Sequence, residues 1–326
     1  MSTHPTWQKA LSSAITDISE LCALLEIDAA DADLIRDAQH SFALRVPREF
    51  ISRMEKGNPN DPLLLQVLPQ AIEMQKTPGF SADPVGEIQK NPVPGLLHKY
   101  LNRVLLTLTG ACAIHCRYCF RRHFPYAENN PSRANWDRAL EYISQDKNIE
   151  EVILSGGDPL VLKDHLLAEF VEQLAKIPHV TRLRIHTRLP IVIPARVTDL
   201  FLAWMRESRF RVIVVLHCNH PNEIDSHVLL ALKKLRDASI TVLNQSVLLK
   251  NVNDNAAALV NLSKKLFEAG VLPYYLHLLD KVDGSAHFDV SSEQAHELMS
   301  EIKKQLPGFL VPKLAREVPG MLHKEF

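Results

Sequence analysis

The stretch "RVLLTLTGACAIHCRYCF", Arg103 to Phe120, joins an apolar run to a loop that holds three cysteines. The run RVLLTLTG has the aliphatic and β-branched character of a buried strand that ends at a glycine. Cys112, Cys116 and Cys119 follow with the spacing C-x3-C-x2-C. The stretch therefore predicts a buried strand whose carboxyl end carries a group of thiols.

The same pattern continues toward the C-terminus. Further strand-like runs are EEVILSGG, TRLRIHTR, RVIVVLHC, TVLNQSVLL and LPYYLHLLD, and amphipathic patterns follow near residues 135–145, 164–175, 197–207, 225–237, 256–269 and 291–305. Apolar strands that alternate with helices indicate right-handed βαβ units and a parallel sheet. Six units predict an α/β fold, either an incomplete barrel or an open doubly wound sheet. In both, ligands bind at the carboxyl ends of the strands, where the cysteines lie.

The regions that flank these units differ in character. Residues 1–98 are predicted as an N-terminal helical region, 99–308 as the barrel core and 309–326 as a C-terminal segment. In the first region, WQKALSSAITDISELCALLEI has helical spacing, and PREFISRMEKGNPNDPLLLQVL predicts two short helices broken at GNPNDP. Residues 77–94 are rich in proline and glycine and predict a connecting loop.

Composition limits the function classes. The 326 residues are 46% hydrophobic and 23% charged with a net charge of −1, which argues against a general nucleic-acid or membrane surface. The start, MSTHPTWQKA, lacks the pattern of a secretory signal, and we see no apolar run long enough to span a membrane. Five cysteines favour a reducing cytoplasm, and we expect Cys22 and Cys218 to be buried small hydrophobes.

The three clustered thiols need one more ligand to close a zinc site, and His115 or His123 could provide it. Electron-transfer iron–sulfur proteins usually supply one cysteine for each iron. Three cysteines leave one iron of a cubane open, and the spacing resembles the signature of radical S-adenosylmethionine enzymes. A different reading is a metal-stabilised protein that contacts RNA through Arg121–His123.

The segments YCFRRHFPYAEN, SGGDPL, RLRIHTRLPIVIPARVTDL, NQSVLL, PYYLHLLDKVDGSAHF and LVPKLARE resemble the lysine 2,3-aminomutase family. Within that family, the sequence is most similar to the branch that makes (R)-β-lysine for modification of translation elongation factor P. The resemblance implies an incomplete (βα)6 barrel with an N-terminal helical extension and a C-terminal tail across its mouth. It also implies an isomerase that converts L-α-lysine with a [4Fe-4S] cluster, S-adenosylmethionine and pyridoxal 5′-phosphate. The implied partners are an electron donor such as flavodoxin or ferredoxin and an elongation factor P ligase.

The resemblance also assigns roles to individual positions. Cys112, Cys116 and Cys119 are implied as the cluster ligands. The positions implied to contact S-adenosylmethionine are Ser155, Gly156, Gly157, Asp158, His217 and Gln245. For the SGGDPL motif, a tight strand-to-helix turn is the alternative, and for His217 and Gln245 it is a supporting role in the core.

Pyridoxal phosphate and the substrate need their own contacts. The resemblance implies that Lys324 binds pyridoxal phosphate covalently and that Lys99 and Arg103 hold its phosphate. The turn before Lys324 has fewer glycines than the family pattern, so Lys313 and Lys281 remain alternatives. Arg121 is implied to pair with the substrate carboxylate, and Asp280 and Glu317 to receive the ε-ammonium of lysine. Glu317 stands where the family usually has aspartate, so an aminomutase for another amino acid also remains open.

Overall fold

The computed structural model describes residues 6–28, 32–129 and 132–326. The first five residues of MSTHPTWQKA, the start that lacks the pattern of a secretory signal, lie outside this range. Its centre is one eight-stranded sheet in the order β1 to β8, in which β1 is antiparallel to β2 and every later pair is parallel. Within the described residues, no pairing joins β8 to β1, so the predicted incomplete barrel is confirmed. The strands are β1 Leu96–Tyr100, β2 Arg103–Thr107, β3 Glu151–Ser155, β4 Arg182–Thr187, β5 Arg211–His217, β6 Thr241–Val247, β7 Leu272–His277 and β8 Lys313–Ala315.

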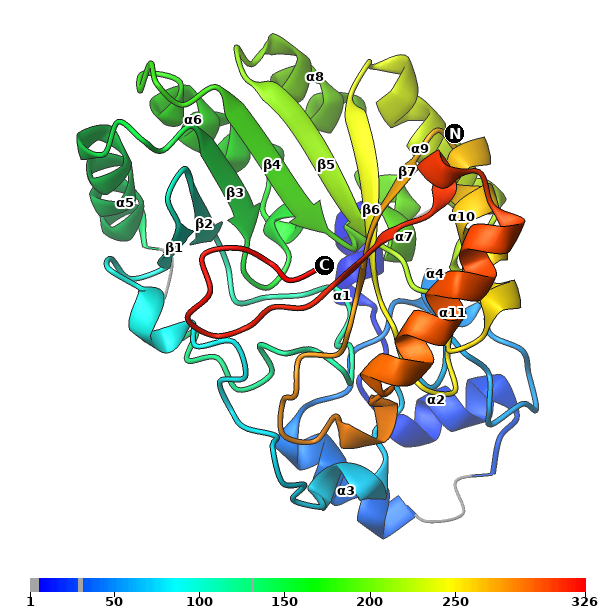
Figure 1. The fold of residues 1–326 in the computed structure, drawn as a ribbon. Helices are drawn as coiled ribbons and strands as arrows, with labels where there is room; N and C mark the ends of the chain where they lie inside the picture. Colours follow the sequence, from blue (N-terminus) through cyan, green and yellow to red (C-terminus); the bar gives the residue numbers. More distant parts are fainter. Residues whose placement is uncertain (1–5, 29–31, 130–131) are drawn as a thin grey trace.

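Six longer helices follow the strands as predicted. Several begin at a serine, threonine, aspartate or asparagine whose side chain accepts a backbone N–H of the first turn, which fixes where each helix starts. Figure 1 shows them along the outer side of the sheet. They are α5 Arg133–Gln145, α6 Asp164–Leu174, α8 Asp199–Glu207, α9 Ser226–Asp237, α10 Ala256–Glu268 and α11 Ser292–Gln305, and the short α7 spans Leu189–Val192.

The N-terminal region is helical but more broken than its pattern indicates. Helices α1 Trp7–Ser12 and α2 Ile18–Leu25 are separated where Ile15 pairs with Val46 in a short antiparallel bridge. They are followed by α3 Ala32–Ser41 and α4 Arg48–Ile51. The predicted helix after GNPNDP is a series of turns instead, because the Asp61 carboxylate accepts the N–H groups of Leu63 and Leu64. One-turn 3-10 helices lie at Ala71–Met74, Ile88–Lys90, Pro159–Val161, Pro194–Arg196, Pro221–Glu223, Ala286–Phe288 and Gly308–Leu310.

The sheet has two strands that the sequence did not predict. β1 crosses the expected boundary at residue 98 and pairs with β2, so the barrel sheet begins before that residue. β8 has three residues, too few for a periodic pattern. After it the chain turns back, and Arg316 and Glu325 exchange two backbone hydrogen bonds of 2.9 and 3.0 Å. Figure 1 shows this red C-terminal segment crossing in front of the strands.

The N-terminal helices share one core with the barrel. Trp7, Leu21 and Phe50 belong to the same cluster of buried side chains as Val152 of β3 and Val214 of β5. No helix within the described ranges is long and apolar enough to cross a membrane.

A buried ionic cluster ties the N-terminal region to the cysteine loop. The Glu73 carboxylate accepts Nε of Arg117 at 2.9 Å and Nη2 of Arg122 at 2.9 Å, and all three side chains are almost completely buried. Arg117 also donates to the carbonyl oxygens of Ala38 and Phe42. One carboxylate thus neutralises two guanidinium groups inside the protein.

We predict that Glu73→Gln lowers the free energy of unfolding by about 3–5 kcal/mol, because it leaves two buried cations without their counter-ion. The matched control is Glu20→Gln, which removes a half-exposed ion pair with Arg48 and should cost about 0.5 kcal/mol. Denaturant unfolding of the metal-free proteins measures both. Equal losses for the two variants would contradict this account of the cluster.

Candidate active site

The three cysteines lie together on the loop after β2, as predicted. All three are half-buried, and the Cys119 amide donates to the Cys116 carbonyl at 3.0 Å. Burial raises the pKa of the Cys119 thiol to about 11, with a further rise from the neighbouring Cys116. Burial and the proximity of Cys119 also raise the pKa of Cys112. Among the described residues, no group of three or more His, Cys, Asp or Glu side chains is arranged as a metal site.

The two histidines of the zinc alternative are turned to other partners. His115 Nδ1 lies 2.7 Å from the Ala43 carbonyl, and its ring stacks on Phe42 at 5.2 Å. His123 Nε2 lies 3.4 Å from the Asp283 carbonyl. Each contact involves one ring nitrogen only, so these contacts do not decide between the zinc site and the iron–sulfur cluster.

The SGGD turn packs directly against the cysteine loop. Gly157 N–H donates to the Thr109 carbonyl at 2.7 Å, and a Cβ on Gly157 would stand 2.2 Å from the Ala111 carbonyl oxygen. Gly156 has a φ of +116°, which L side chains rarely adopt. The glycines are therefore required for the close approach of two backbone segments at the mouth of the barrel.

Asp158 has a structural role in this turn. Its fully enclosed carboxylate accepts the hydroxyl of Thr187 at 2.8 and 2.9 Å and the backbone N–H groups of Leu160, Arg188 and Leu189 at 2.8–3.1 Å. These donors leave it little capacity for the ammonium group that the resemblance implies. Its contacts instead join the turn after β3 to the turn after β4.

Arg121 lies beside the same turn but is already paired. Its guanidinium makes a two-pronged ion pair with Glu87, with both N–O distances 2.7 Å, and Nη1 donates to Ser155 Oγ at 3.1 Å. Arg121 and Glu87 are 7% and 6% exposed, so this pair is buried. The expected carboxylate-binding arginine thus holds a carboxylate of its own chain.

Lys324 reaches the barrel mouth, although it lies two residues from the C-terminus. Its ammonium pairs with Glu317, which also accepts the Tyr100 hydroxyl at 2.8 Å and lies 3.5 Å from Lys99 Nζ. The hairpin between Arg316 and Glu325 brings the two ends of this pair together. The sequence-predicted Lys99, Glu317 and Lys324 therefore form one cluster, defined here as the mouth cluster, with Tyr100 as its unpredicted fourth member.

Asp280 faces the mouth cluster. Removal from water raises the pKa of its carboxyl to about 7, Lys324 opposes that rise, and Glu317 adds to it. The imidazole of His277 is enclosed nearby, and burial beside Lys324 lowers its pKa to about 3. A carboxyl group whose ionisation is made unfavourable by burial indicates a site for a cationic ligand.

The remaining predicted positions lie around this centre. The Arg103 guanidinium lies over the Tyr100 ring, 4.0 Å from its centroid, and the hydroxyl of that ring donates to Glu317. His217 and Gln245 are opposite each other in the β5–β6 register. The alternative lysines lie elsewhere: Lys313 is exposed beside Phe326, and Lys281 is half-exposed and pairs with Asp289.

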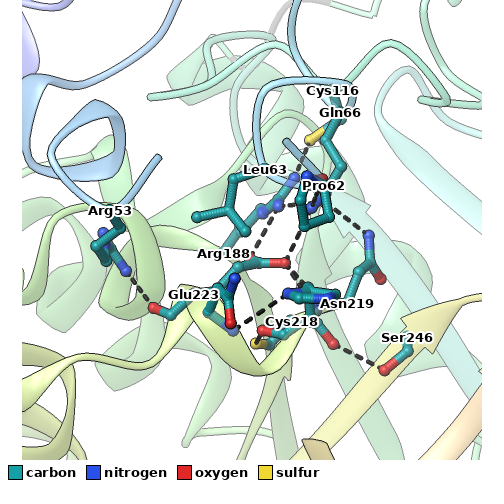
Figure 2. Close-up of polar contacts among 12 residues, drawn as sticks. Arg53, Pro62, Leu63, Gln66, Cys116, Arg188, Cys218, Asn219, Glu223 and Ser246 are labelled. Atoms are coloured by element: carbon teal, nitrogen blue, oxygen red, sulfur yellow. Dashed lines mark hydrogen bonds and ion pairs between the residues drawn. The ribbon is translucent and has the colours of Figure 1, made fainter. Parts of the chain in front are cut away.

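A second buried network surrounds Cys116 (Figure 2). Arg188, which follows β4, donates to Cys116 Sγ and, through its other arm, to Gln66 Oε1, both at 2.7 Å. The same arm pairs with Glu223 at 2.9 Å. We call this group, together with Tyr118 and Asn219, the Arg188 network.

The residues at the mouth fit the implied cofactors. Three thiols share one loop, and the buried Nε2 atoms of His186 and His217 lack a hydrogen-bond partner among the described residues. A ligand in the barrel would satisfy such atoms. Lys99 could supply a cation for a phosphate, and Lys324 could supply the amine that an aldehyde requires.

Sequence reasoning missed several groups at this site. Glu87 lies in the proline- and glycine-rich connection, where no periodic pattern marks a buried carboxylate. Tyr100 lies on the unpredicted β1. The position of Arg188 could be predicted, because the motif HTR stands at a strand end. Its partners could not, because they come from distant segments.

We predict that Asp280→Asn stabilises the cofactor-free protein in a pH-dependent way. The folded pKa lies above the ordinary value of about 4, so ionisation of Asp280 costs stability as the pH rises from about 4 to about 7. The gain of the variant over the parent should be near zero below pH 4 and reach about 1–4 kcal/mol above pH 7. Unfolding titrations across this range measure it, and a difference that does not change with pH would refute the assignment.

The chain is similar to several known proteins. Residues 106–262 match the Radical SAM superfamily. The chain is 56% identical to L-lysine 2,3-aminomutase of Escherichia coli (strain K12), over 96% of this chain and 92% of that protein. It is 51% identical to the L-lysine 2,3-aminomutase of Haemophilus influenzae, covering 98% and 94%, and 47% identical to that of Buchnera aphidicola, covering 96% and 93%. The chain belongs to the lysine 2,3-aminomutase family of radical S-adenosylmethionine isomerases, which use a [4Fe-4S] cluster and pyridoxal phosphate.

Proposed function

We propose that this protein converts L-α-lysine to (R)-β-lysine by moving the amino group from carbon 2 to carbon 3. The observation that carries the proposal is the mouth cluster with Asp280, in which two lysines and two carboxylates lie together in the barrel. A pair of acidic groups favours a substrate with a distal ammonium and repels one with a distal carboxylate. This supports lysine over glutamate as the substrate.

The bound groups would supply the chemistry that amino-acid side chains lack. When bound, the cluster and S-adenosylmethionine would supply radical chemistry for hydrogen abstraction, and pyridoxal phosphate would supply a carrier for the amino group. In our proposal, Cys112, Cys116 and Cys119 hold the cluster, and Lys324 holds pyridoxal phosphate. The protein mainly contributes positioning of the reacting atoms and exclusion of water.

The contacts to S-adenosylmethionine come from the turn after β3 and from β5 and β6. We assign its methionine end to Ser155 and to the backbone of Gly156 and Gly157, because Asp158 is saturated by protein donors. His217 is the second contact, since burial lowers its pKa to about 4 and leaves a neutral imidazole whose Nε2 has no partner in the described part of the chain. Gln245, opposite His217 in the register, is the third.

Both ends of the substrate have counterparts within the chain. Glu87 occupies Arg121 as a substrate carboxylate would, and the Lys324 ammonium occupies Glu317 as the ε-ammonium of lysine would. When Lys324 is committed to pyridoxal phosphate, Glu317 and Asp280 lose its positive charge and become a stronger site for an ammonium group. Lys99, 3.5 Å from Glu317, and Arg103, over the Tyr100 ring, remain to hold a phosphate.

Anaerobic reconstitution tests the proposed function. The protein is loaded with iron, sulfide and pyridoxal phosphate, and then given S-adenosylmethionine, a strong reductant and L-lysine. Chromatography of the products should show β-lysine of R configuration, whereas Cys119→Ala should assemble no cluster and form none. A loaded parent protein that leaves lysine unchanged but rearranges glutamate would indicate a sister aminomutase instead.

We predict opposite effects at the two ends of the Arg121–Glu87 pair. Arg121→Gln should raise KM for lysine at least thirtyfold, because it removes a buried partner worth about 2–5 kcal/mol. Glu87→Gln should lower KM several-fold, because the competing internal carboxylate is gone. Steady-state kinetics over a range of lysine concentrations measure both. A higher KM for Glu87→Gln would instead make Glu87 a support for Arg121.

The cellular role forms a further part of the proposal. The resemblance to the elongation factor P branch supports β-lysine as the product that an elongation factor P ligase consumes. A flavodoxin or ferredoxin would supply the electron. Five cysteines, three of them proposed as ligands of a reducible cluster, support a cytoplasmic location.

A further inference from the structure

We propose that Arg188 tunes the reduction potential of the iron–sulfur cluster through its hydrogen bond to Cys116, and that Glu223 limits this effect. The inference rests on the proposed ligation by the three cysteines. It concerns two residues that neither bind lysine nor belong to the cysteine motif. Arg188 acts here as a positioning residue on the cluster sulfur.

The geometry places a full positive charge on one ligand sulfur. Nη1 of Arg188 donates to Cys116 Sγ and to the Tyr118 hydroxyl, both at 2.7 Å. The side chain is 6% exposed, so water screens its charge weakly. Figure 2 shows the guanidinium between Cys116 and Glu223.

Glu223 is the buried counter-ion of that charge. Its side chain is 0% exposed, and Oε2 pairs with Arg188 Nη2 at 2.9 Å. Its other oxygen, Oε1, accepts the backbone N–H groups of Asn219 and His220 at 2.9 and 3.1 Å. These donors and Arg188 hold the pKa of Glu223 below its usual range, so the carboxylate stays ionised.

The arrangement fixes the direction of each effect. When the cluster gains one electron from a low-potential donor, negative charge grows on its sulfurs, and hydrogen bonds and nearby cations stabilise the reduced form. Arg188 therefore raises the potential and eases reduction. Glu223 carries the opposite charge on the far side of the guanidinium and lowers it. A network that served only to hold the fold would give no such pair of opposite signs.

Potentiometric titration of the reconstituted cluster, followed by electron paramagnetic resonance, tests the proposal without lysine, S-adenosylmethionine or pyridoxal phosphate. Arg188→Gln should lower the midpoint potential, and Glu223→Gln should raise it. A tenfold change in the ratio of reduced to oxidised cluster corresponds to about 59 mV for one electron, and we expect shifts of this order. Arg188→Lys, which keeps the charge but loses the fork, should fall between the parent and Arg188→Gln.

The matched control is Arg196→Gln. Arg196 is also a buried arginine in an ion pair, with Asp164 at 2.8 Å, but it contacts Trp7 and Phe201 instead of a cysteine. This variant should lose stability in denaturant unfolding while its midpoint potential stays at the parent value. If Arg188→Gln does not retain the cluster, the midpoint potential of Glu223→Gln alone tests the proposal.

Unchanged potentials in the loaded Arg188 and Glu223 variants, or shifts of the same sign in both, would overturn the proposal. A parent protein that assembles no cluster would instead refute the ligation by the cysteines. The two failures are therefore distinguishable.

Discussion

Parallel pairing of β2 to β8 is the constraint on which the site depends. Neighbouring parallel strands run in the same direction, so their carboxyl ends meet at one edge of the sheet. The cysteine loop, the SGGD turn, the HTR turn and Asp280 all follow such ends. Residues separated by 72 positions along the chain, such as Cys116 after β2 and Arg188 after β4, therefore reach hydrogen-bond distance.

Charge pairing within the chain makes this crowded edge stable. Guanidinium groups and carboxylates taken from water need partners, and each buried arginine of the site has one: Arg117 has Glu73, Arg121 has Glu87 and Arg188 has Glu223. The carboxylates come from outside the strands, mostly from connecting segments. The N-terminal region thus contributes counter-ions to the site, and it also shares a core with the barrel.

The sequence predicted much of the fold because its patterns are local. The six strands and six long helices have clear periodicity, and the glycine and cysteine motifs identify one edge of the sheet. β1, β8 and the C-terminal hairpin are too short to show periodicity. They form because they pair with other segments, which a local pattern does not reveal. Glu87 could not be predicted, because its burial depends on Arg121, 34 residues further along the chain. The saturated state of Asp158 depends likewise on a turn after a different strand.

The central claim is that the C-terminal hairpin brings Lys324 into the barrel mouth as the lysine that binds pyridoxal phosphate. Borohydride reduction of the protein loaded with pyridoxal phosphate, followed by peptide mapping, measures this directly. The account predicts a pyridoxyl label on Lys324 in the parent and little label in Lys324→Ala. In the labelled parent, the ion pair between Lys324 and Glu317 should be broken. A label on Lys313 or Lys281 would contradict it, because the structure places Lys313 on the exposed side of β8 and pairs Lys281 with Asp289.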